Sequence, residues 1–284
     1  MNILVTGGAG FVGTNLIKRL LKDGHNVVSL DNYSTGTEEN HQEGCEYVDA
    51  DIRDVIDFSY FMEKPDVIYH LGAIARIQPS FVNPAPTLET GILGTMNVLE
   101  WVRELENKPK LIFAGSSSVH SGKLKNPYTF SKNVADDMCM LYREHFDVDV
   151  SICRFYNVYG PHQLTEGEYC TVVGIFERQY KEGVELTITG DGEQRRDFTH
   201  IDDIVEGLIL TSESETSHKT IELGRGQNHS INELAEMFGC GFTYIPERPG
   251  EAKITLCDTS EALVKIGYKP KVNIEDYVKE IINE

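Results

Sequence analysis

The sequence has 284 residues, of which 40% are hydrophobic and 25% charged, and its formal net charge is -19 at pH 7. These values are typical of a soluble globular protein with one large or two modest domains. A charge of this sign disfavours nucleic acid or an anionic membrane as partner. Any site for an anionic nucleotide must therefore gather arginines locally.

The six cysteines are scattered and form no C-x-x-C pair. Because no signal peptide or long apolar run opens the chain, we expect a reduced, cytoplasmic protein. His and Cys never cluster at the spacing of metal ligands, so we expect no structural metal.

The first residues predict a strand, a helix and a second strand around a glycine-rich turn. An apolar, β-prone run over 2–6 breaks into the glycine-rich segment 7–13. Residues 14–21 then carry apolar side chains at helical spacing, and a second strand is predicted over 26–30. This is the order of elements in a dinucleotide-binding unit.

The glycines match a phosphate-binding fingerprint. Gly8, Gly10 and Gly13 satisfy G-x-G-x-x-G, and Gly7, Gly10 and Gly13 satisfy a version spaced by three residues. Such a turn lets a pyrophosphate approach the backbone amides at the positive end of the helix. Asp31, at the end of the second strand, stands where a carboxylate binds the adenosine ribose and repels a 2′-phosphate. We therefore predict an NAD site that includes Gly7, Gly10, Phe11, Val12, Gly13, Asp31 and Asn32.

Two more strand ends are predicted to complete the cofactor site. A third strand over 45–48 runs into Asp51 and Ile52, a carboxylate and an apolar side chain that could hydrogen-bond and sandwich an adenine. The alternative for Asp51 is a helix N-cap. A fourth strand over 66–73 ends in Leu71, Gly72 and Ala73, and the small residues there would leave room for the nicotinamide half of the cofactor.

Apolar spacing predicts a long helix over 94–106, and residues 110–114 predict a fifth strand that opens into the serines at 116–118. Strands that alternate with helices indicate an α/β fold with a doubly wound parallel sheet covered on both faces. Ligands of such sheets bind at the carboxyl ends of the strands, where these polar residues fall.

Tyr128 and Lys132 open the next helix, which should run to about Phe146, and they lie on one face of it. An ammonium near the phenol favours phenolate and lowers the tyrosine pKa toward a useful value for a general base. Ser117 can hold the substrate hydroxyl or relay its proton. We therefore predict Ser117, Tyr128 and Lys132 as catalytic, with Tyr128 and Lys132 also contacting the cofactor. The alternative for the Tyr-Lys pair is a solvated helix face.

On these motifs the chain resembles the extended short-chain dehydrogenase/reductases, in the sugar-nucleotide epimerase and dehydratase group, and most of all the UDP-glucose 4-epimerases. The similarity runs almost end to end and includes the segments 154–161, 190–203, 248–251 and 258–260. The resemblance implies NAD-dependent 4-epimerisation of a UDP-hexose through a 4-keto sugar.

The resemblance also implies the substrate contacts. Ser117, Ser118 and Asn157 would hold the sugar, and Arg196 and Arg248 would bind the diphosphate or uridine portion. These arginines supply the local positive charge that a nucleotide site needs in this acidic chain. The alternative for Arg196 is an ion pair with Asp197 or Asp202.

Other activities remain open at this stage. Family dehydratases place an Asp-Glu pair where this chain has Ser118-Val119, which favours simple epimerisation, although an acid could come from Glu166 or Glu168. The decarboxylases of the group likewise carry a nearby Glu, and a reductase is a further alternative. Gly91 in place of the usual Asn, and a short loop between Ser117 and Tyr128, also leave open an inactive NAD-binding protein.

We expect residues 1–160 to form an NAD-binding Rossmann domain, to which 197–228 return, and residues 161–196 with 229–284 to form a smaller substrate-binding domain. The resemblance also suggests a homodimer that packs the helices beginning near Gly94 and Tyr128 against their symmetry mates. The candidate apolar contacts on the second helix are Val134, Met138, Leu141 and Tyr142, although some of them must instead face their own sheet.

Overall fold

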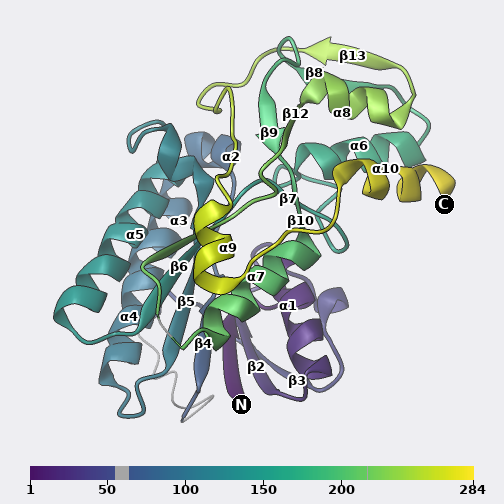
Figure 1. Cartoon of the computed structure of the whole chain (residues 1–284). Helices are drawn as coiled ribbons and strands as arrows, with labels where there is room; N and C mark the ends of the chain where they lie inside the picture. Colours follow the sequence, from purple (N-terminus) through teal and green to yellow (C-terminus); the bar gives the residue numbers. More distant parts are fainter. Residues whose placement is uncertain (55–63, 216) are drawn as a thin grey trace.

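The computed structural model describes residues 1–54, 64–215 and 217–284, which form a larger lobe around a central sheet and a smaller lobe beyond one end of it (Figure 1). In this part of the chain the main sheet has seven parallel strands in the order β11-β6-β5-β4-β1-β2-β3. Their bounds are Asn2–Thr6 (β1), Asn26–Asp31 (β2), Cys45–Asp49 (β3), Val67–His70 (β4), Lys110–Ser116 (β5), Val150–Phe155 (β6) and Thr220–Leu223 (β11). The order reverses between β1 and β4, and the carboxyl ends beside such a reversal form a ligand crevice.

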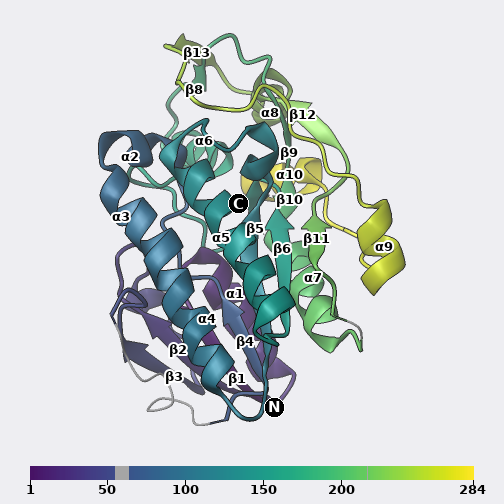
Figure 2. The same ribbon diagram turned by 90° about the vertical axis from the view of Figure 1, so that its left-hand side faces the viewer.

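Helices cover both faces of this sheet (Figures 1 and 2). α4 (Thr95–Glu104) and α5 (Pro127–His145) lie on one face, and α1 (Phe11–Lys22) and α7 (Ile201–Glu213) lie on the other. The predicted doubly wound α/β fold is confirmed.

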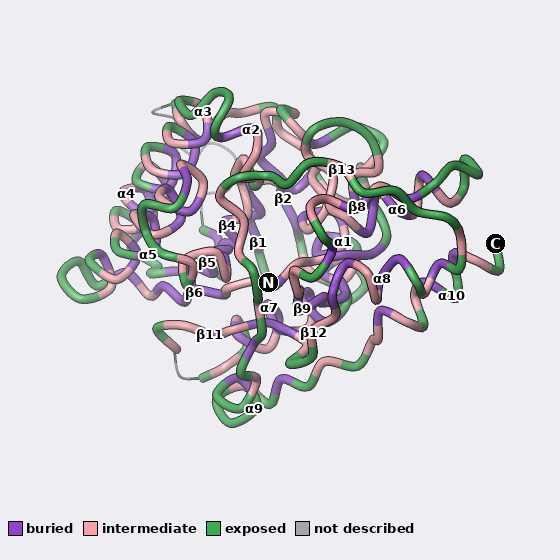
Figure 3. Tube along the Cα trace, turned by 90° about the horizontal axis from the view of Figure 1, so that it is seen from above, coloured by how far each residue is buried: buried purple, intermediate pink, exposed green. Residues whose placement is uncertain are grey.

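Both faces of the central strands are buried, which explains why the strands read as unbroken apolar runs. Along β1, Leu4 packs in the hydrophobic core that includes Val98 of α4, whereas Ile3 and Val5 pack in the core that includes Leu16 of α1. This alternation follows from the two-residue period of a strand. Figure 3 shows the buried segments gathered along the sheet and its covering helices.

A chain of short helices leads from β4 to α4. α2 (Ile77–Val82) and α3 (Pro84–Leu88) precede one wide helical turn, η3 (Glu89–Gly94). Within that turn, a Cβ on Gly91 would lie 2.9 Å from both the Cβ and the Oγ of Ser131 on α5. Glycine at this position therefore lets η3 pack closely against α5.

The smaller lobe has its own hydrophobic core. Its parallel strand pair joins β8 (Leu186–Thr189) to β13 (Phe242–Ile245), and its antiparallel pair joins β9 (Arg195–Asp197) to β12 (Asn228–Ser230). The helices of this lobe are α6 (Val172–Lys181), α8 (Ile231–Phe238) and α10 (Ile274–Asn283).

A short parallel pair, β7 (Val158–Tyr159) with β10 (Thr199–His200), lies between the lobes. α9 (Ser260–Ile266) returns to the larger lobe, because Ala262 packs in the core with α1 and α7. The proposed division into two domains stays a prediction. The separate cores support it, with α9 placed on the cofactor side.

Two details bear on the predicted assembly. Leu141 on α5 is exposed, but the adjacent Tyr142 is buried and its hydroxyl donates a hydrogen bond to Glu100 of α4. Tyr142 is therefore one of the residues that pack within their own chain, and the dimer contact of the helix stays a prediction. None of the described helices is both long and apolar enough to cross a lipid bilayer.

Candidate active site

A cavity of about 480 Å³ lies at the carboxyl ends of the central strands, facing the smaller lobe. Most of the predicted site residues line it. These are Gly7, Gly10, Phe11, Val12, Gly13, Asp31, Asn32, Ile52, Leu71, Gly72, Ala73, Ser117, Ser118, Tyr128, Asn157, Arg196 and Arg248. Asp51 and Lys132 lie outside its wall.

The glycine turn fits a pyrophosphate. Gly7 has a φ of 75°, and a Cβ on Gly13 would lie only 2.2 Å from the Gly7 carbonyl oxygen. The turn therefore packs directly on the first turn of α1, which only glycine allows. Gly10 caps that helix without any side-chain hydrogen bond, so the amides there are left for a ligand.

Asp31 is poised beside this turn. One carboxylate oxygen accepts the Ala9 N–H and the other accepts the Tyr33 N–H, both at 2.9 Å. Burial raises the pKa of Asp31, and the two backbone hydrogen bonds oppose that shift. Each oxygen keeps a lone pair, so the carboxylate can still accept from ribose hydroxyls.

The Asp51 carboxylate is held by two neighbouring side chains. Arg53 forms an ion pair with it at 2.6 Å, and the Asn32 amide donates to it at 2.8 Å. The Arg53 hydrogen bonds hold the pKa of Asp51 well below its usual range. Ile52 lines the cavity wall, whereas the Asp51 carboxylate points into this pair instead. The adenine contact of Asp51 stays a prediction.

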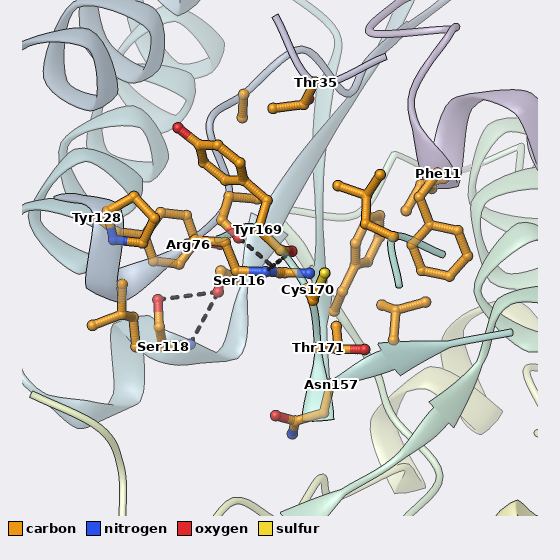
Figure 4. A pocket seen from close by; sticks show the side chains of 18 of the residues that line it. Phe11, Thr35, Arg76, Ser116, Ser118, Tyr128, Asn157, Tyr169, Cys170 and Thr171 are labelled. Carbon is orange, nitrogen blue, oxygen red and sulfur yellow. Dashed lines mark hydrogen bonds between the residues drawn. The ribbon is translucent and has the colours of Figure 1, made fainter. Parts of the chain in front are cut away.

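The hydroxyl beside Tyr128 belongs to Ser116, one residue before the predicted Ser117. The Ser116 side chain lies beside the Tyr128 phenol and lowers its pKa. Ser116 Oγ also donates to Ser118 Oγ at 3.0 Å (Figure 4). The reason is the length of β5, which continues beyond Ala114 and carries Ser116 to the carboxyl end of the sheet. Ser117 begins the following short helix, η4 (Ser117–Ser121).

Lys132 does not act on the phenol as predicted. Its Nζ donates to the Ala114 carbonyl at 2.7 Å and lies 4.9 Å from the ring centroid of Phe113. Burial lowers the pKa of Lys132 to about 8. Burial raises the pKa of Tyr128, and the opposing influences are the Ser116 side chain and the charge of Arg76. The expected lowering of the phenol pKa by Lys132 is therefore wrong for this structure.

The two predicted arginines line the part of the cavity formed by the smaller lobe. Arg196 is buried, and its Nη2 donates to Glu251 at 3.2 Å. It does not form the alternative pair with Asp197, whose carboxylate accepts backbone N–H groups such as that of Cys257. Asn157 has a φ of 27° and donates to Thr255 Oγ1 at 2.9 Å, which fixes its amide at the cavity.

Sequence reasoning missed several residues of the wall. Arg76, at the start of α2, lies between Tyr128 and Cys170 in Figure 4. Tyr169 and Cys170 come from the segment between β7 and α6, which carries no motif. Only Ser116 had a signal in the sequence, since it belongs to the same serine run as the predicted residue.

Comparison with known protein families agrees with this site. The model of the NAD dependent epimerase/dehydratase family matches residues 3–224. The chain belongs to this family. Membership confirms the predicted resemblance and NAD as the cofactor, and the glycine turn and Asp31 provide a site that suits it.

Individual members of the family are similar over almost the whole chain. A putative UDP-glucose 4-epimerase of Methanocaldococcus jannaschii is 30% identical, over 99% of this chain and 97% of that protein. UDP-glucuronic acid decarboxylase 1 of Xenopus tropicalis is 32% identical, over 99% of this chain and 71% of that protein. The crystal structure of UDP-glucose 4-epimerase from Thermotoga maritima with UDP-glucose gives a TM-score of 0.93 at 29% identity, covering 100% of this chain and 98% of that one. These findings confirm the predicted class, an NAD-dependent sugar-nucleotide epimerase.

Proposed function

We propose that this epimerase inverts the configuration at C4 of a UDP-hexose. The observation that carries the proposal is the pair formed by Tyr128 and Ser116, which lie beside each other in the cavity wall. The pair stands in the same cavity as the glycine turn, at the carboxyl end of β5. A base and a hydroxyl beside a dinucleotide site are the groups that reversible oxidation of a secondary alcohol requires.

NAD, when bound, supplies the group that takes a hydride from C4 and later returns it. The protein supplies the proton chemistry. Ser116 holds the 4-hydroxyl of the sugar, and Tyr128 as phenolate removes its proton when C4 is oxidised. After the 4-keto sugar turns over in the cavity, Tyr128 returns a proton to the oxygen. No net redox change follows, so the cofactor is regenerated in each cycle.

The remaining predicted contacts would position NAD and the sugar nucleotide relative to each other. Gly7, Gly10 and Gly13 would receive the pyrophosphate of NAD, and Asp31 its adenosine ribose. Arg196 and Arg248 would bind the diphosphate of the substrate, because guanidinium groups pair well with phosphate oxygens. Asn157, fixed by Thr255, would contact the sugar.

The residues after Ser116 disfavour elimination. A 4,6-dehydratase needs an acid and a base beside C5 and C6, yet the two positions that follow are Ser117 and Ser118. Glu168 does line the cavity, but it is exposed, and Glu166 is not part of the wall. An inactive NAD-binding protein is also disfavoured, because the reacting pair is intact.

A panel of nucleotide sugars tests this proposal. The purified protein is incubated with UDP-, GDP- and dTDP-sugars, and the products are identified by mass and by NMR. The proposal predicts C4 epimers of unchanged mass from a UDP-hexose. A product that has lost water would indicate a dehydratase, and one that has lost carbon dioxide would indicate a decarboxylase. Tight NAD binding without turnover of any sugar would favour the inactive alternative.

We also propose the homodimer that the resemblance suggests, and a cytoplasmic location. Exposed apolar side chains on the outer helical face support the dimer, namely Leu93, Met96 and Leu141. The absence of disulfides among the six cysteines is consistent with a reducing compartment. Light scattering at micromolar concentration tests the assembly, and a monomeric mass would rule the dimer out.

A further inference from the structure

Arg76 is a cation of the active-site cavity that has no carboxylate partner in the described part of the chain. The Nε of Arg76 donates to the carbonyl oxygen of Tyr169, and its Nη1 donates to the carbonyl oxygen of Ala75 at 2.8 Å. Both acceptors are neutral. Across residues 1–54, 64–215 and 217–284, no Asp or Glu lies within 4.0 Å of the guanidinium.

Two other enclosed arginines of this acidic chain pair with carboxylates, whereas Arg225, which is not part of the cavity wall, donates to the neutral Pro270 carbonyl and Asn273 side chain. Arg154 lies 2.8 Å from Asp136 and 3.0 Å from Glu222, and Arg196 lies 3.2 Å from Glu251. Removing a guanidinium from water is costly unless an anion compensates it. Burial accordingly lowers the pKa of Arg76. A cation kept without a counter-ion at a ligand cavity indicates that the ligand brings the anion.

The position of Arg76 limits which part of a ligand it can meet. Its charge acts on the Tyr128 phenol and on the Cys170 thiol, so the guanidinium lies near the reacting end of the cavity. In Figure 4, Phe11, the first residue of α1, lies on the other side of the cavity from Tyr128. The pyrophosphate of NAD belongs beside that helix, and Arg196 and Arg248 of the smaller lobe serve the nucleotide diphosphate. The anion at Arg76 is therefore a substituent of the sugar.

We propose that Arg76 binds a carboxylate at C6 of the sugar, so that the preferred form of the UDP-hexose substrate is the one oxidised at C6, a UDP-hexuronic acid. This inference rests on the proposed function, which places the 4-hydroxyl of the sugar at Tyr128. C6 is attached to C5, the neighbour of C4, so a C6 carboxylate can reach a group beside the phenol. Nη2 and the second N–H of Nη1 have no acceptor among the described residues, and together they present the forked geometry that suits a carboxylate.

A pair of substrates that differ only at C6 tests this directly. UDP-glucuronic acid and UDP-glucose are compared by kcat/KM, and by calorimetric titration of the NAD-loaded protein, with wild type and Arg76→Gln. The wild type is expected to prefer the hexuronate. Arg76→Gln should lower the hexuronate-to-hexose ratio of kcat/KM about 10- to 100-fold, the range for a lost hydrogen bond to a charged group. The ratio of binding constants should fall with it.

Matched variants keep the test decisive. Arg19→Gln removes a half-buried arginine of α1 that pairs with Asp23 and with Glu206 of α7, and it should leave the ratio as in wild type. Arg76→Lys retains the charge without the fork, so its ratio should lie between wild type and Arg76→Gln, and this variant answers the question if Arg76→Gln does not fold.

An unchanged substrate ratio in both Arg76 variants would overturn the proposal. So would a loss of bound NAD with the ratio intact, because Arg76 would then serve a phosphate of the cofactor. The calorimetric titration tests this inference separately from the proposed function. Preferential, Arg76-dependent binding of the hexuronate without epimerisation would sustain the carboxylate site and refute the C4 chemistry. Epimerisation of both sugars with no dependence on Arg76 would support the C4 chemistry and refute the carboxylate site.

Discussion

The side chain of Ser116, the last residue of β5, lies beside the phenol of Tyr128 near the start of α5 and lowers its pKa. Because this contact favours phenolate and orients the 4-hydroxyl, Ser116→Ala should lower kcat on the order of 100-fold. The adjacent Ser117→Ala is the matched control and should lose much less. Steady-state kinetics on the best substrate of the panel measure both. Equal losses, or a larger loss in Ser117→Ala, would return the role to Ser117.

Tyr128→Phe removes only the hydroxyl that takes the proton. Turnover should fall about 100- to 10,000-fold, the range for loss of a general base, while NAD content and melting temperature stay close to wild type. The exposed Tyr244→Phe serves as a control for the substitution itself. Full activity in Tyr128→Phe would sink the catalytic assignment.

Gly13 and Gly10 differ in how much space surrounds them. A Cβ at position 13 would lie 2.2 Å from the Gly7 oxygen, whereas one at position 10 would lie 3.3 Å from it. Gly13→Ala should therefore lower the free energy of unfolding by about 1–3 kcal/mol and abolish NAD binding. Gly10→Ala should cost less stability. Urea denaturation and NAD titration compare the two, and equal stabilities would contradict this packing.

Much of the cofactor half could be predicted from sequence because its signals are local. The apolar runs, the glycine turn and Asp31 lie within one strand-helix-strand unit, and each element depends on neighbours in the chain. The identity of the reacting serine could not be fixed in this way. It depends on where β5 stops, and the ladder with β6 extends that strand to Ser116, beyond the apolar run that marks it in the sequence.

The remaining site residues depend on long-range packing. Arg76 meets Tyr169 across the cavity, although 93 positions separate them in the chain. Lys132 follows Tyr128 by one helical turn, yet its ammonium donates a hydrogen bond to the carbonyl of Ala114 in β5. Helical spacing places two side chains on one face, but it does not say which partner each will bind.

Lys132 makes the stability of the NAD-free protein depend on pH. Burial lowers its pKa from 10.5 to about 8 in the folded protein, so between these values the unfolded chain binds more protons. The free energy of unfolding should therefore rise as pH increases from 8 to 10.5, on the order of 3 kcal/mol relative to Lys132→Met. The exposed Lys279→Met should follow wild type. If the difference in the free energy of unfolding between wild type and Lys132→Met stayed constant or fell over this pH range, burial of Lys132 would not lower its pKa.

The most direct test of the central claim follows a label at C4. UDP-hexose or UDP-hexuronic acid carrying deuterium at C4 is incubated with the NAD-loaded protein, and the product is examined by NMR and mass spectrometry. If the hydride leaves C4 and returns to it, the C4 epimer should form with its deuterium retained at C4 and with no net reduction of NAD. Loss of the deuterium to water, elimination of water or carbon dioxide, or inversion at a carbon other than C4 would contradict the account.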